Sequence, residues 1–208
     1  MSFRIEKKIA IDKDKIFFLK KFLYEKKFNE IFEKRMIYSL YLDTINFKMY
    51  YDSIEGIVPR KKIRFRSYNN FFNKDVLLEK KISSVEGRFK TSNKTNEFNK
   101  ILKYGYFDNN YGVCYPKLFV RYERSYYKKN NIRITIDKKI NFAKFNQDLR
   151  NTPFYSFGDY DCAEIKYNSL KEFEQLEMDI FLSIRNSKYC IGIDHILKNS
   201  DIYSDPIN

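Results

Sequence analysis

One segment of the chain carries four cationic side chains at alternate positions, and this pattern suits the binding of phosphate groups. The four cations are Arg60, Lys62, Arg64 and Arg66. Side chains alternate between the two faces of a β-strand, so the four would share one face at spacings of about 7 Å. At an effective dielectric constant of about 20, each neighbouring pair would repel by roughly 2.4 kcal/mol. A partly enclosed face of this kind needs an anion, and arginine forks with lysine point charges are suited to phosphate.

Five other segments alternate charged and apolar residues in the same way. For any one strand, the simpler explanation is a sheet with one face in water. The acidic residues among the cations favour a divalent metal ion, although they could instead pair with neighbouring lysines and arginines. The charged sides of the five segments are Arg4, Glu6 and Lys8; Glu79 and Lys81; Glu86, Arg88 and Lys90; Arg133, Thr135 and Asp137; and Glu164 and Lys166.

The elements that would hold these residues are short strands with a few helices between them. Period-2 alternation predicts eight strands, at residues 3–11, 37–43, 58–68, 75–83, 85–92, 117–127, 131–140 and 160–167. Helical periodicity predicts helices at residues 13–27 and 170–184, with weaker ones at 47–54, 95–104 and 191–198. Within 117–127 the charges fall on both parities, Arg121 with Glu123 and Tyr122 with Arg124. The chain has only 6 Gly and 4 Pro and no evident linker, so we expect one domain over residues 1–208.

The fold class that follows is α+β. We expect an antiparallel, closed eight-stranded β-barrel with its charged faces inward and its helices packed outside on the apolar faces. The interior of such a barrel would be a cationic tunnel. A tunnel excludes duplex nucleic acid, whereas a slender chain of phosphates or the triphosphate of a nucleotide would fit.

Composition narrows the class of partner. The formal net charge is +13, which favours a polyanionic partner, and 43% hydrophobic with 18% aromatic residues excludes intrinsic disorder. The first residues do not form an apolar signal sequence, so we expect a cytoplasmic location. The predicted first helix carries Lys20, Lys21, Lys26 and Lys27, which form a solvated face or a surface for acidic lipid or a membrane partner.

Eight short motifs, in one order along nearly the whole chain, carry a family resemblance. The sequence resembles the vacuolar transporter chaperone (VTC) domain, the polyphosphate polymerase branch of the triphosphate tunnel metalloenzymes. The motifs are Arg4-x-Glu6-x-Lys8, Ser39-x-Tyr41-x-Asp43, Arg64-x-Arg66, Glu79-x-Lys81, Tyr122-x-Arg124, Arg133-x-Thr135-x-Asp137, Glu164-x-Lys166 and Ser187-Lys188-Tyr189.

This resemblance implies a metal-dependent transfer of the terminal phosphoryl group of ATP to a growing polyphosphate chain. Mn²⁺, or Mg²⁺ in its place, is the implied cofactor, and ATP and inorganic polyphosphate are the implied partners. The residues assigned to catalysis are Arg64, Arg66, Lys81, Arg124 and Arg133. Those assigned to substrate binding are Lys8, Arg60, Lys62, Arg88, Lys90, Tyr122, Lys166, Ser187 and Lys188, with the family position shared between Arg88 and Lys90 left open. The metal ligands are Glu164 and Glu6.

One departure from the broader superfamily bears on the reaction. Arg4 stands where a Glu-x-Glu-x-Lys start would place its first glutamate, which favours polymerase over a two-metal hydrolase. The resemblance also implies a bare catalytic domain of bacterial type, at the cytosolic face of a membrane through a separate membrane protein. The alternatives are a triphosphate or polyphosphate hydrolase of the same fold and a non-catalytic polyphosphate or nucleotide binder. Nucleic acid is not the expected partner, although RNA or DNA binding would also explain the charge and the aromatic residues.

Overall fold

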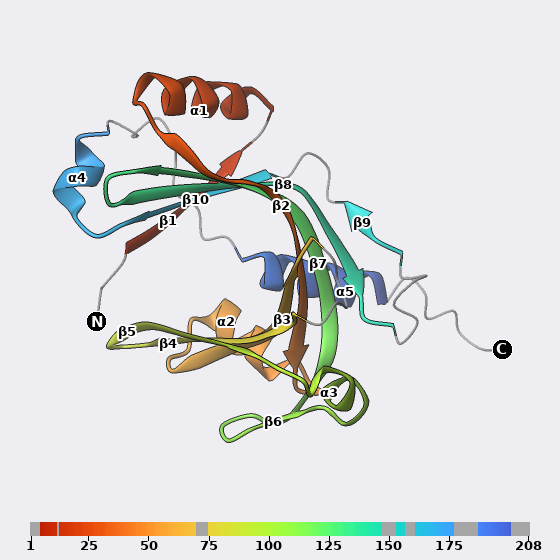
Figure 1. The fold of residues 1–208 in the computed structure, drawn as a ribbon. Coiled ribbons are helices and arrows are strands. Elements are labelled where there is room, and N and C mark those ends of the chain that lie inside the picture. Colours follow the sequence, from red (N-terminus) through yellow and green to blue (C-terminus); the bar gives the residue numbers. More distant parts are fainter. Residues whose placement is uncertain are drawn as a thin grey trace. The chain divides into compact units, whose positions relative to one another are not determined.

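A single β-sheet organises the chain, with helices between its strands (Figure 1). The computed structural model describes residues 5–11, 13–69, 75–146, 153–156, 161–176 and 187–200. The strands are β1 (Ile5–Ile11), β2 (Asn29–Asp43), β3 (Arg60–Tyr68), β4 (Leu77–Ser84), β5 (Gly87–Lys94), β6 (Tyr106–Asp108), β7 (Gly112–Lys129), β8 (Ile132–Lys144), β9 (Tyr155–Ser156) and β10 (Asp161–Tyr167). The helices are α1 (Lys13–Glu25), α2 (Lys48–Glu55), α3 (Phe98–Tyr104), α4 (Leu170–Glu174) and α5 (Lys188–Ser200).

The hydrogen-bonded strands follow the order β1-β10-β8-β7-β2-β3-β4-β5, with β6 beside β7 and β9 beside β8. The pairings β1 with β10, β10 with β8, β3 with β4, β4 with β5 and β6 with β7 are all antiparallel. The α+β class and the antiparallel eight-strand path are therefore confirmed. Among the described residues the strands form an open path from β1 to β5, with no ladder between these two, so closure into a barrel stays a prediction.

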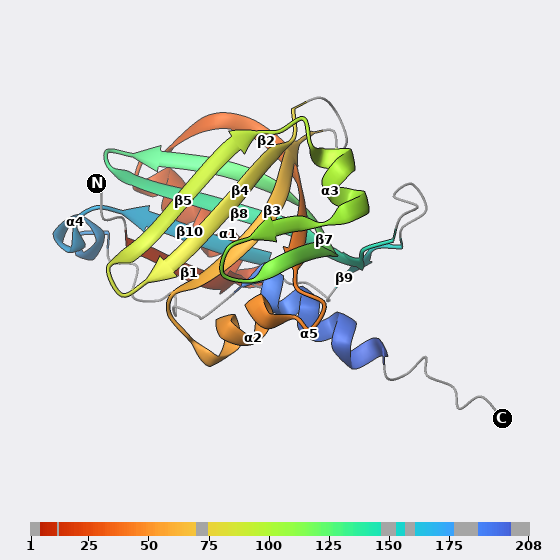
Figure 2. The same cartoon turned by 90° about the horizontal axis from the view of Figure 1, so that it is seen from below.

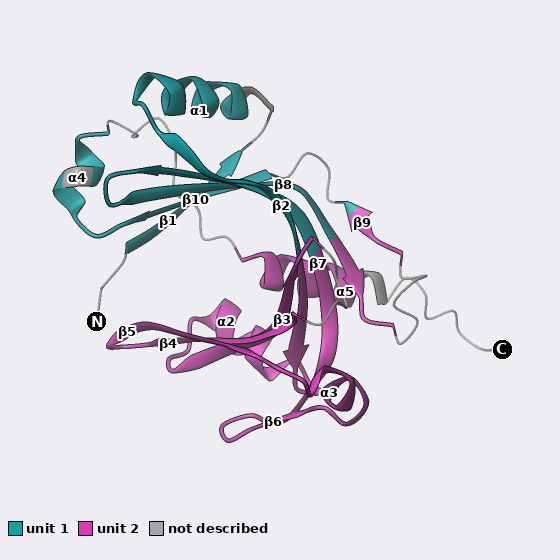
Figure 3. Cartoon of the chain, viewed as in Figure 1, with its two compact units in different colours: residues 1–37, 121–141, 156–186 teal, residues 38–120, 142–155, 187–208 magenta. Residues whose placement is uncertain are grey.

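Contacts divide the chain into two compact units, coloured separately in Figure 3. Unit 1 comprises residues 1–37, 121–141 and 156–186, and unit 2 comprises residues 38–120, 142–155 and 187–208. Boundaries fall inside β2, β7, β8 and β9, so neither unit is a continuous piece of sequence. The single domain over residues 1–208 stays a prediction.

The predicted elements agree well with the observed ones. Every predicted strand corresponds to a long strand of the sheet, although β2 begins at Asn29 instead of residue 37, and the short β6 and β9 were not expected. The helices predicted at 13–27, 47–54, 95–104 and 191–198 correspond to α1, α2, α3 and α5. The helix predicted at 170–184 is present as α4, which ends at Glu174. The part of the predicted helix beyond residue 176 lies outside the described residues. Arg4 and residue 160, the start of a predicted strand, also lie outside them.

Alternation explains how unit 1 forms its core. Ile9 of β1, Ile134 of β8 and Ile165 of β10 are buried with Leu19 and Leu23 of α1. The apolar parity of the strands thus faces α1, which lies along this side of the sheet in Figure 1. The charged parity of the same strands lies on the opposite side of the sheet.

Unit 2 is built in the same way, with the apolar parity of β3 against α3. Ile63 and Phe65 are fully buried, and the ring of Phe65 meets that of Phe98 edge to face at 4.8 Å. At the end of β2, Asp43 holds the start of α2, because its carboxylate accepts hydrogen bonds from the backbone N–H groups of Met49 and Tyr50. These contacts leave Lys62, Arg64 and Arg66 on the other side of β3.

Candidate functional site

The charged sides of β3, β4 and β5 form one surface of unit 2, which we call the cationic face. The three strands run side by side in Figure 2. Directly opposed residues on neighbouring strands point to the same side of a sheet, so the strand register assembles the face. Its rows are Arg60, Ser83 and Arg88; Lys62, Lys81 and Lys90; Arg64, Glu79 and Ser92; and Arg66, Leu77 and Lys94.

Glu79 is the centre of the cationic face. Its Oε2 lies 2.6 Å from Arg64 Nη2 and 3.5 Å from Arg66 Nη1, and its Oε1 lies 2.5 Å from Lys90 Nζ. Burial by itself would raise the pKa of the Glu79 carboxyl, but the charges of Arg64, Arg66 and Lys90 overcome that effect and lower the pKa to about 2. Glu79 is therefore a carboxylate at all physiological pH values.

The two arginines beside Glu79 are largely shielded from water, whereas Lys90 is about half exposed. The side chain of Arg66 is 7% exposed and that of Arg64 is 21% exposed. The pKa of Lys90 is lowered by burial and by repulsion from Arg64 and Arg66, against the attraction of Glu79. An ordinary solvated sheet face would leave its arginines in water, so this shielding favours a binding surface over the simpler explanation.

The row formed by Lys62, Lys81 and Lys90, which we call the lysine row, contacts the start of α5 through Lys62. Lys62 Nζ donates a hydrogen bond to Ser187 Oγ over 2.7 Å, and lies 5.4 Å from the centre of the Tyr189 ring. The ring of Tyr189 lies beside that of Tyr41, tilted by 33° with the ring centres 5.0 Å apart, and Arg64 Nη1 donates to the Tyr41 hydroxyl over 2.8 Å. The predicted Ser187 is thus brought to the cationic face, and Lys188 is the first residue of α5.

Two tyrosines on this side of unit 2 have opposite electrostatic surroundings. Burial would raise the pKa of Tyr41, but Arg64, Arg66 and Lys62 lower it below its ordinary value. The pKa of Tyr189 is raised well above its ordinary value by burial and by Asp43, whose carboxylate accepts a hydrogen bond from the Tyr189 hydroxyl. Tyr41 therefore belongs to the cationic environment, whereas Tyr189 ties α5 to the carboxylate that caps α2.

Arg60 differs from the other cations of β3. Its Nη1 donates to the backbone carbonyl of Ile57 over 2.9 Å and to that of Gly56 over 3.3 Å. Although Arg60 has the predicted parity, its guanidinium is hydrogen-bonded to the loop before β3. Arg88 has the same parity and an exposed side chain on β5, one row away from the lysine row.

The charged sides of β1, β10, β8 and β7 in unit 1 form a second surface, which we call the mixed face. Lys166 Nζ lies 2.7 Å from Glu6 Oε1 and 2.9 Å from Glu164 Oε1. Arg124 makes a bidentate pair with Asp137, with Nε to Oδ1 at 2.5 Å and Nη2 to Oδ2 at 2.7 Å. Each carboxylate of this face thus has a cation beside it.

The other predicted residues of unit 1 join this face through the strand register. Lys8 lies opposite Glu164, and Arg133 lies opposite Lys166. The bidentate pair of Arg124 with Asp137 of β8 decides the ambiguous parity of β7 in favour of Tyr122 and Arg124. The guanidinium of Arg124 lies 5.2 Å from the Tyr122 ring centre. Two buried polar atoms of the face, Arg133 Nε and Thr135 Oγ1, have no hydrogen-bond partner among the described residues.

The acidic residues of the mixed face suit a hard divalent cation. Burial would raise the pKa of Glu164, but Lys166, Lys8 and Arg124 hold it well below its ordinary value, so the group is anionic. Glu6 and Glu164 converge on the same ammonium group. Among the described residues no three His, Cys, Asp or Glu side chains gather as a metal-ligand group. Mg²⁺ and similar ions are commonly held by one or two carboxylates together with substrate phosphates, so the pair of glutamates fits such an ion.

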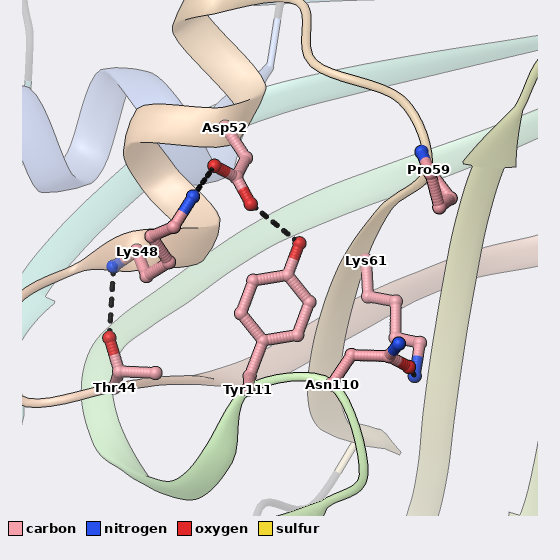
Figure 4. A pocket seen from close by; sticks show the side chains of 7 residues that line it. All are labelled: Thr44, Lys48, Asp52, Pro59, Lys61, Asn110 and Tyr111. Carbon is pink, nitrogen blue, oxygen red and sulfur yellow. Dashed lines mark hydrogen bonds and ion pairs between the residues drawn. The ribbon is translucent and has the colours of Figure 1, made fainter.

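A separate pocket of unit 2, with a volume of about 330 Å³, lies on the other parity of β3 (Figure 4). Its two lysines are already neutralised by carboxylates. Lys61 Nζ lies 3.0 Å from both carboxylate oxygens of Asp108, and Lys48 pairs with Asp52. The Tyr111 hydroxyl also donates to Asp52, over 2.8 Å. The pocket therefore lacks the excess of positive charge that the cationic face has.

Sequence reasoning missed the parts of the site that depend on pairing between strands. Glu79 was noticed for its parity, but nothing in its own segment showed that it would hold Arg64 and Lys90. Tyr41 and Asp43 were noted only within a motif. The alternation on β3 and β4 together could have found Glu79, because an antiparallel hairpin places one acid among cations of the partner strand.

Together, the antiparallel sheet, its two charged faces and the helices on its apolar side define an α+β class of protein. The chain matches the VTC domain in two overlapping segments, residues 3–111 and 89–197, which together span most of its length. The chain belongs to the VTC domain family. No curated protein matches it.

Solved structures give the fold a wider context. The Hippeastrum protein HpAC1, for which a dominant triphosphatase activity is described, superimposes with a TM-score of 0.57 over 94% of this chain and 96% of its own, at 13% identity. A conserved protein from Pyrococcus furiosus gives a TM-score of 0.49 over 85% and 87% of the two chains, at 17% identity. The protein PH1012 from Pyrococcus horikoshii OT3 gives 0.48 over 85% and 87%, at 14% identity. The likeness to HpAC1 shows that the two proteins share a fold.

Proposed function

We propose that this VTC domain is a polyphosphate polymerase, which transfers the terminal phosphoryl group of ATP to the end of a polyphosphate chain. The observation that carries the proposal is the cationic face, where Arg64, Arg66 and Lys90 surround one carboxylate and are joined by the lysine row. Membership of the VTC family supports it. The predicted closure of the strands into a tunnel is part of this proposal.

The balance of charge favours a linear phosphate over a nucleic acid. Arg66 is only 7% exposed, and this small exposure favours a slender chain of phosphates over a rigid duplex as its ligand. Guanidinium groups bind phosphate oxygens as a planar fork, and lysines add point charges. Arg64, Arg66 and Lys81 would bind the transferring phosphates on the cationic face, with Lys62, Lys90, Ser187 and Lys188 as further contacts.

The reaction needs no general base on the protein. The attacking group is a terminal oxygen of polyphosphate, which is already anionic. The bond between the terminal phosphorus of ATP and its bridging oxygen breaks, a new bond forms to the attacking oxygen, and ADP leaves. Catalysis is then positioning and charge neutralisation around a loose transition state. Arginines held by carboxylates, as Arg64 and Arg124 are, keep a fixed orientation for that task.

The mixed face would supply a metal-binding function together with further phosphate contacts. Glu164 and Glu6 would hold Mn²⁺ or Mg²⁺, and a bound divalent ion offsets negative charge on the phosphate oxygens of the donor. Arg124 and Arg133 would bind phosphates, with Lys8, Lys166 and Tyr122 beside them. The buried Arg133 Nε and Thr135 Oγ1, which lack hydrogen-bond partners in the described part of the chain, are groups that a ligand could satisfy.

The test is incubation of the purified chain with ATP and Mn²⁺, followed by polyphosphate staining of a gel and measurement of released orthophosphate. We expect polymer that depends on Arg64 and Glu164. Orthophosphate without polymer would assign hydrolysis, with water as acceptor, instead. Tight tripolyphosphate binding without either product would assign a non-catalytic binder, and salt-dependent oligonucleotide binding alone would assign a nucleic-acid protein.

A further inference from the structure

Helix α1 has an outer side that the proposed function does not use. Its inner side is apolar, since Leu19 and Leu23 are buried in the core of unit 1 with Ile16 beside them. The helix lies on the side of the unit 1 strands opposite the mixed face (Figure 1). Whatever binds the outer side of α1 therefore leaves Glu164 and Lys166 accessible.

Three aromatic side chains stand out from this outer side. Phe17 is 66% exposed, Phe18 is 56% exposed and Tyr24 is 86% exposed. Phe17 and Phe18 meet edge to face at 6.0 Å. Single exposed apolar residues are ordinary on a protein surface, but three aromatic rings within two helical turns form a patch.

Lysines are interleaved with these rings. Phe17, Lys20, Lys21 and Tyr24 follow the spacing i, i+3, i+4 and i+7, which places them on one stripe of the helix. Glu25 is the one acid among the α1 side chains that the structure describes, residues 15–25, and Lys21 Nζ lies 3.7 Å from it. The exposed lysines on and next to the helix are Lys15, Lys20, Lys21 and Lys27.

The neighbouring strands add to the positive charge. The pKa of Lys138 on β8 is lowered, first by burial and then by the charge of Lys20, and Lys34 of β2 contributes in the same direction. Asp161 and Glu123 act in the opposite sense on the same group. Cations of three elements thus gather at this side of unit 1.

We propose that the aromatic–lysine surface of α1, defined by Phe17, Phe18, Lys20, Lys21 and Tyr24, docks on an anionic phospholipid surface. Aromatic rings are suited to the level of the lipid head groups, where one end is apolar and the other is wet. Lysines beside them are attracted to anionic head groups within a Debye length. A protein groove fits less well, because lysine is depleted in the cores of protein interfaces, whereas here it alternates with the rings.

The sequence contains no tryptophan, so a single introduced tryptophan can report on lipid contact by its fluorescence. Phe17→Trp would place a single indole on the α1 surface, and Phe107→Trp is a matched control, because Phe107 of β6 is also 66% exposed. With vesicles of phosphatidylcholine and phosphatidylglycerol, we expect a blue shift and quenching by brominated lipid for Phe17→Trp alone. Equal changes in both variants, or no change in Phe17→Trp, would overturn the proposal.

Vesicle sedimentation of the full chain gives a second measurement. Phe17→Gln/Phe18→Gln/Tyr24→Gln should weaken binding to these vesicles about tenfold or more, since the rings supply the apolar contact. The control Tyr104→Gln/Phe107→Gln removes two similarly exposed rings from unit 2 and should leave binding unchanged. Circular dichroism checks that the helices persist. Equal losses in the two variants, binding to neutral vesicles as tight as to anionic ones, or retention on an acidic protein but not on vesicles would contradict the proposal.

Discussion

The two charged faces are built from the same alternation but balance their charges differently. On the mixed face, Lys166 lies between Glu6 and Glu164, and Arg124 forks onto Asp137. On the cationic face, Glu79 alone is shared by Arg64, Arg66 and Lys90. The lysine row and Arg88 add further cations to that face.

This difference indicates which face depends on a ligand for its stability. Shielding a charge from water is costly unless the charge is paired. The mixed face meets this cost with its own carboxylates, and those carboxylates are the natural ligands of a divalent ion. The rows of the cationic face contain more cationic than acidic side chains, so an added anion should stabilise it more than it stabilises the mixed face.

The largest effect should come from removing the shared carboxylate. Glu79→Gln leaves the shielded Arg64 and Arg66, and the half-exposed Lys90, without their anion, and we expect a loss of about 3–5 kcal/mol in the free energy of unfolding. Asp137→Asn should cost a similar amount on the mixed face. In urea unfolding, tripolyphosphate should restore much more stability to Glu79→Gln than to Asp137→Asn, and equal restoration would remove the distinction between the faces.

Lowering the pH should remove the stabilising contribution of the same carboxylate. The pKa of Glu79 is about 2 in the folded chain, below its ordinary value of 4.5, so its contribution is present above pH 4.5 and is lost as the pH falls towards 2. That contribution is about 3 kcal/mol when fully lost. Unfolding measured at pH 5 and pH 3 should show the difference between wild type and Glu79→Gln shrinking. If the difference in the free energy of unfolding stayed constant with pH, the surrounding cations would not lower the pKa of Glu79.

Among the arginines of β3, contact with substrate should separate Arg64 from Arg60. Arg64→Ala should lower polyphosphate synthesis about a hundredfold, or about 2.7 kcal/mol, as expected for a group that stabilises transition-state charge. Arg60→Ala is the matched control on the same strand and face, and it should change the rate less than about threefold, because its guanidinium binds loop carbonyls. The initial rate of polymer formation measures both. If both variants lost activity to a similar extent, the hydrogen bonds of Arg60 to the loop carbonyls would not separate its role from that of Arg64.

Metal dependence should belong to the mixed face. Glu164→Gln should raise the Mn²⁺ concentration needed for half-maximal binding about tenfold, because one charged ligand is lost. Electron paramagnetic resonance of free Mn²⁺ measures this without any turnover. Glu123→Gln, which removes a carboxylate of opposite parity on β7, is the control. If the two variants bind Mn²⁺ alike, Glu164 is not a metal ligand.

The smallest effect should be an alkaline loss of phosphate affinity at the cationic face. Burial and neighbouring arginines lower the pKa of Lys90, so it loses its proton at a lower pH than an ordinary lysine. Tripolyphosphate binding should weaken about threefold between pH 7 and 10, as one of several charges is lost. Lys90→Arg should flatten this dependence in calorimetric titrations. Lys94→Arg should not, because Asp75 raises the pKa of Lys94.

Much of the fold could be predicted from single strands, because alternation in a half-buried strand is a local property. The segment of Arg64 and Arg66 shows both faces of β3 directly. The first half of β2 could not be predicted, since exposed residues such as Glu30, Phe32 and Glu33 do not alternate. Barrel closure was also beyond this reasoning, because it concerns which strands meet.

The candidate site shows the same limit. Parity gave the side on which Lys62, Lys81 and Lys90 lie, but the strand register decides that they form one row. The hydrogen bonds that direct Arg60 to the loop, and those that join Tyr189 to Asp43, link groups through side-chain geometry. No pattern within one segment contains that information.

A crystal structure of the chain with tripolyphosphate and Mn²⁺ tests the central claim most directly. We predict phosphate oxygens on Arg64, Arg66, Lys81 and Lys90, with the metal ion on Glu164. Phosphate bound instead among Lys48, Lys61 and Tyr111, with the pairs of Glu79 unchanged, would contradict the account.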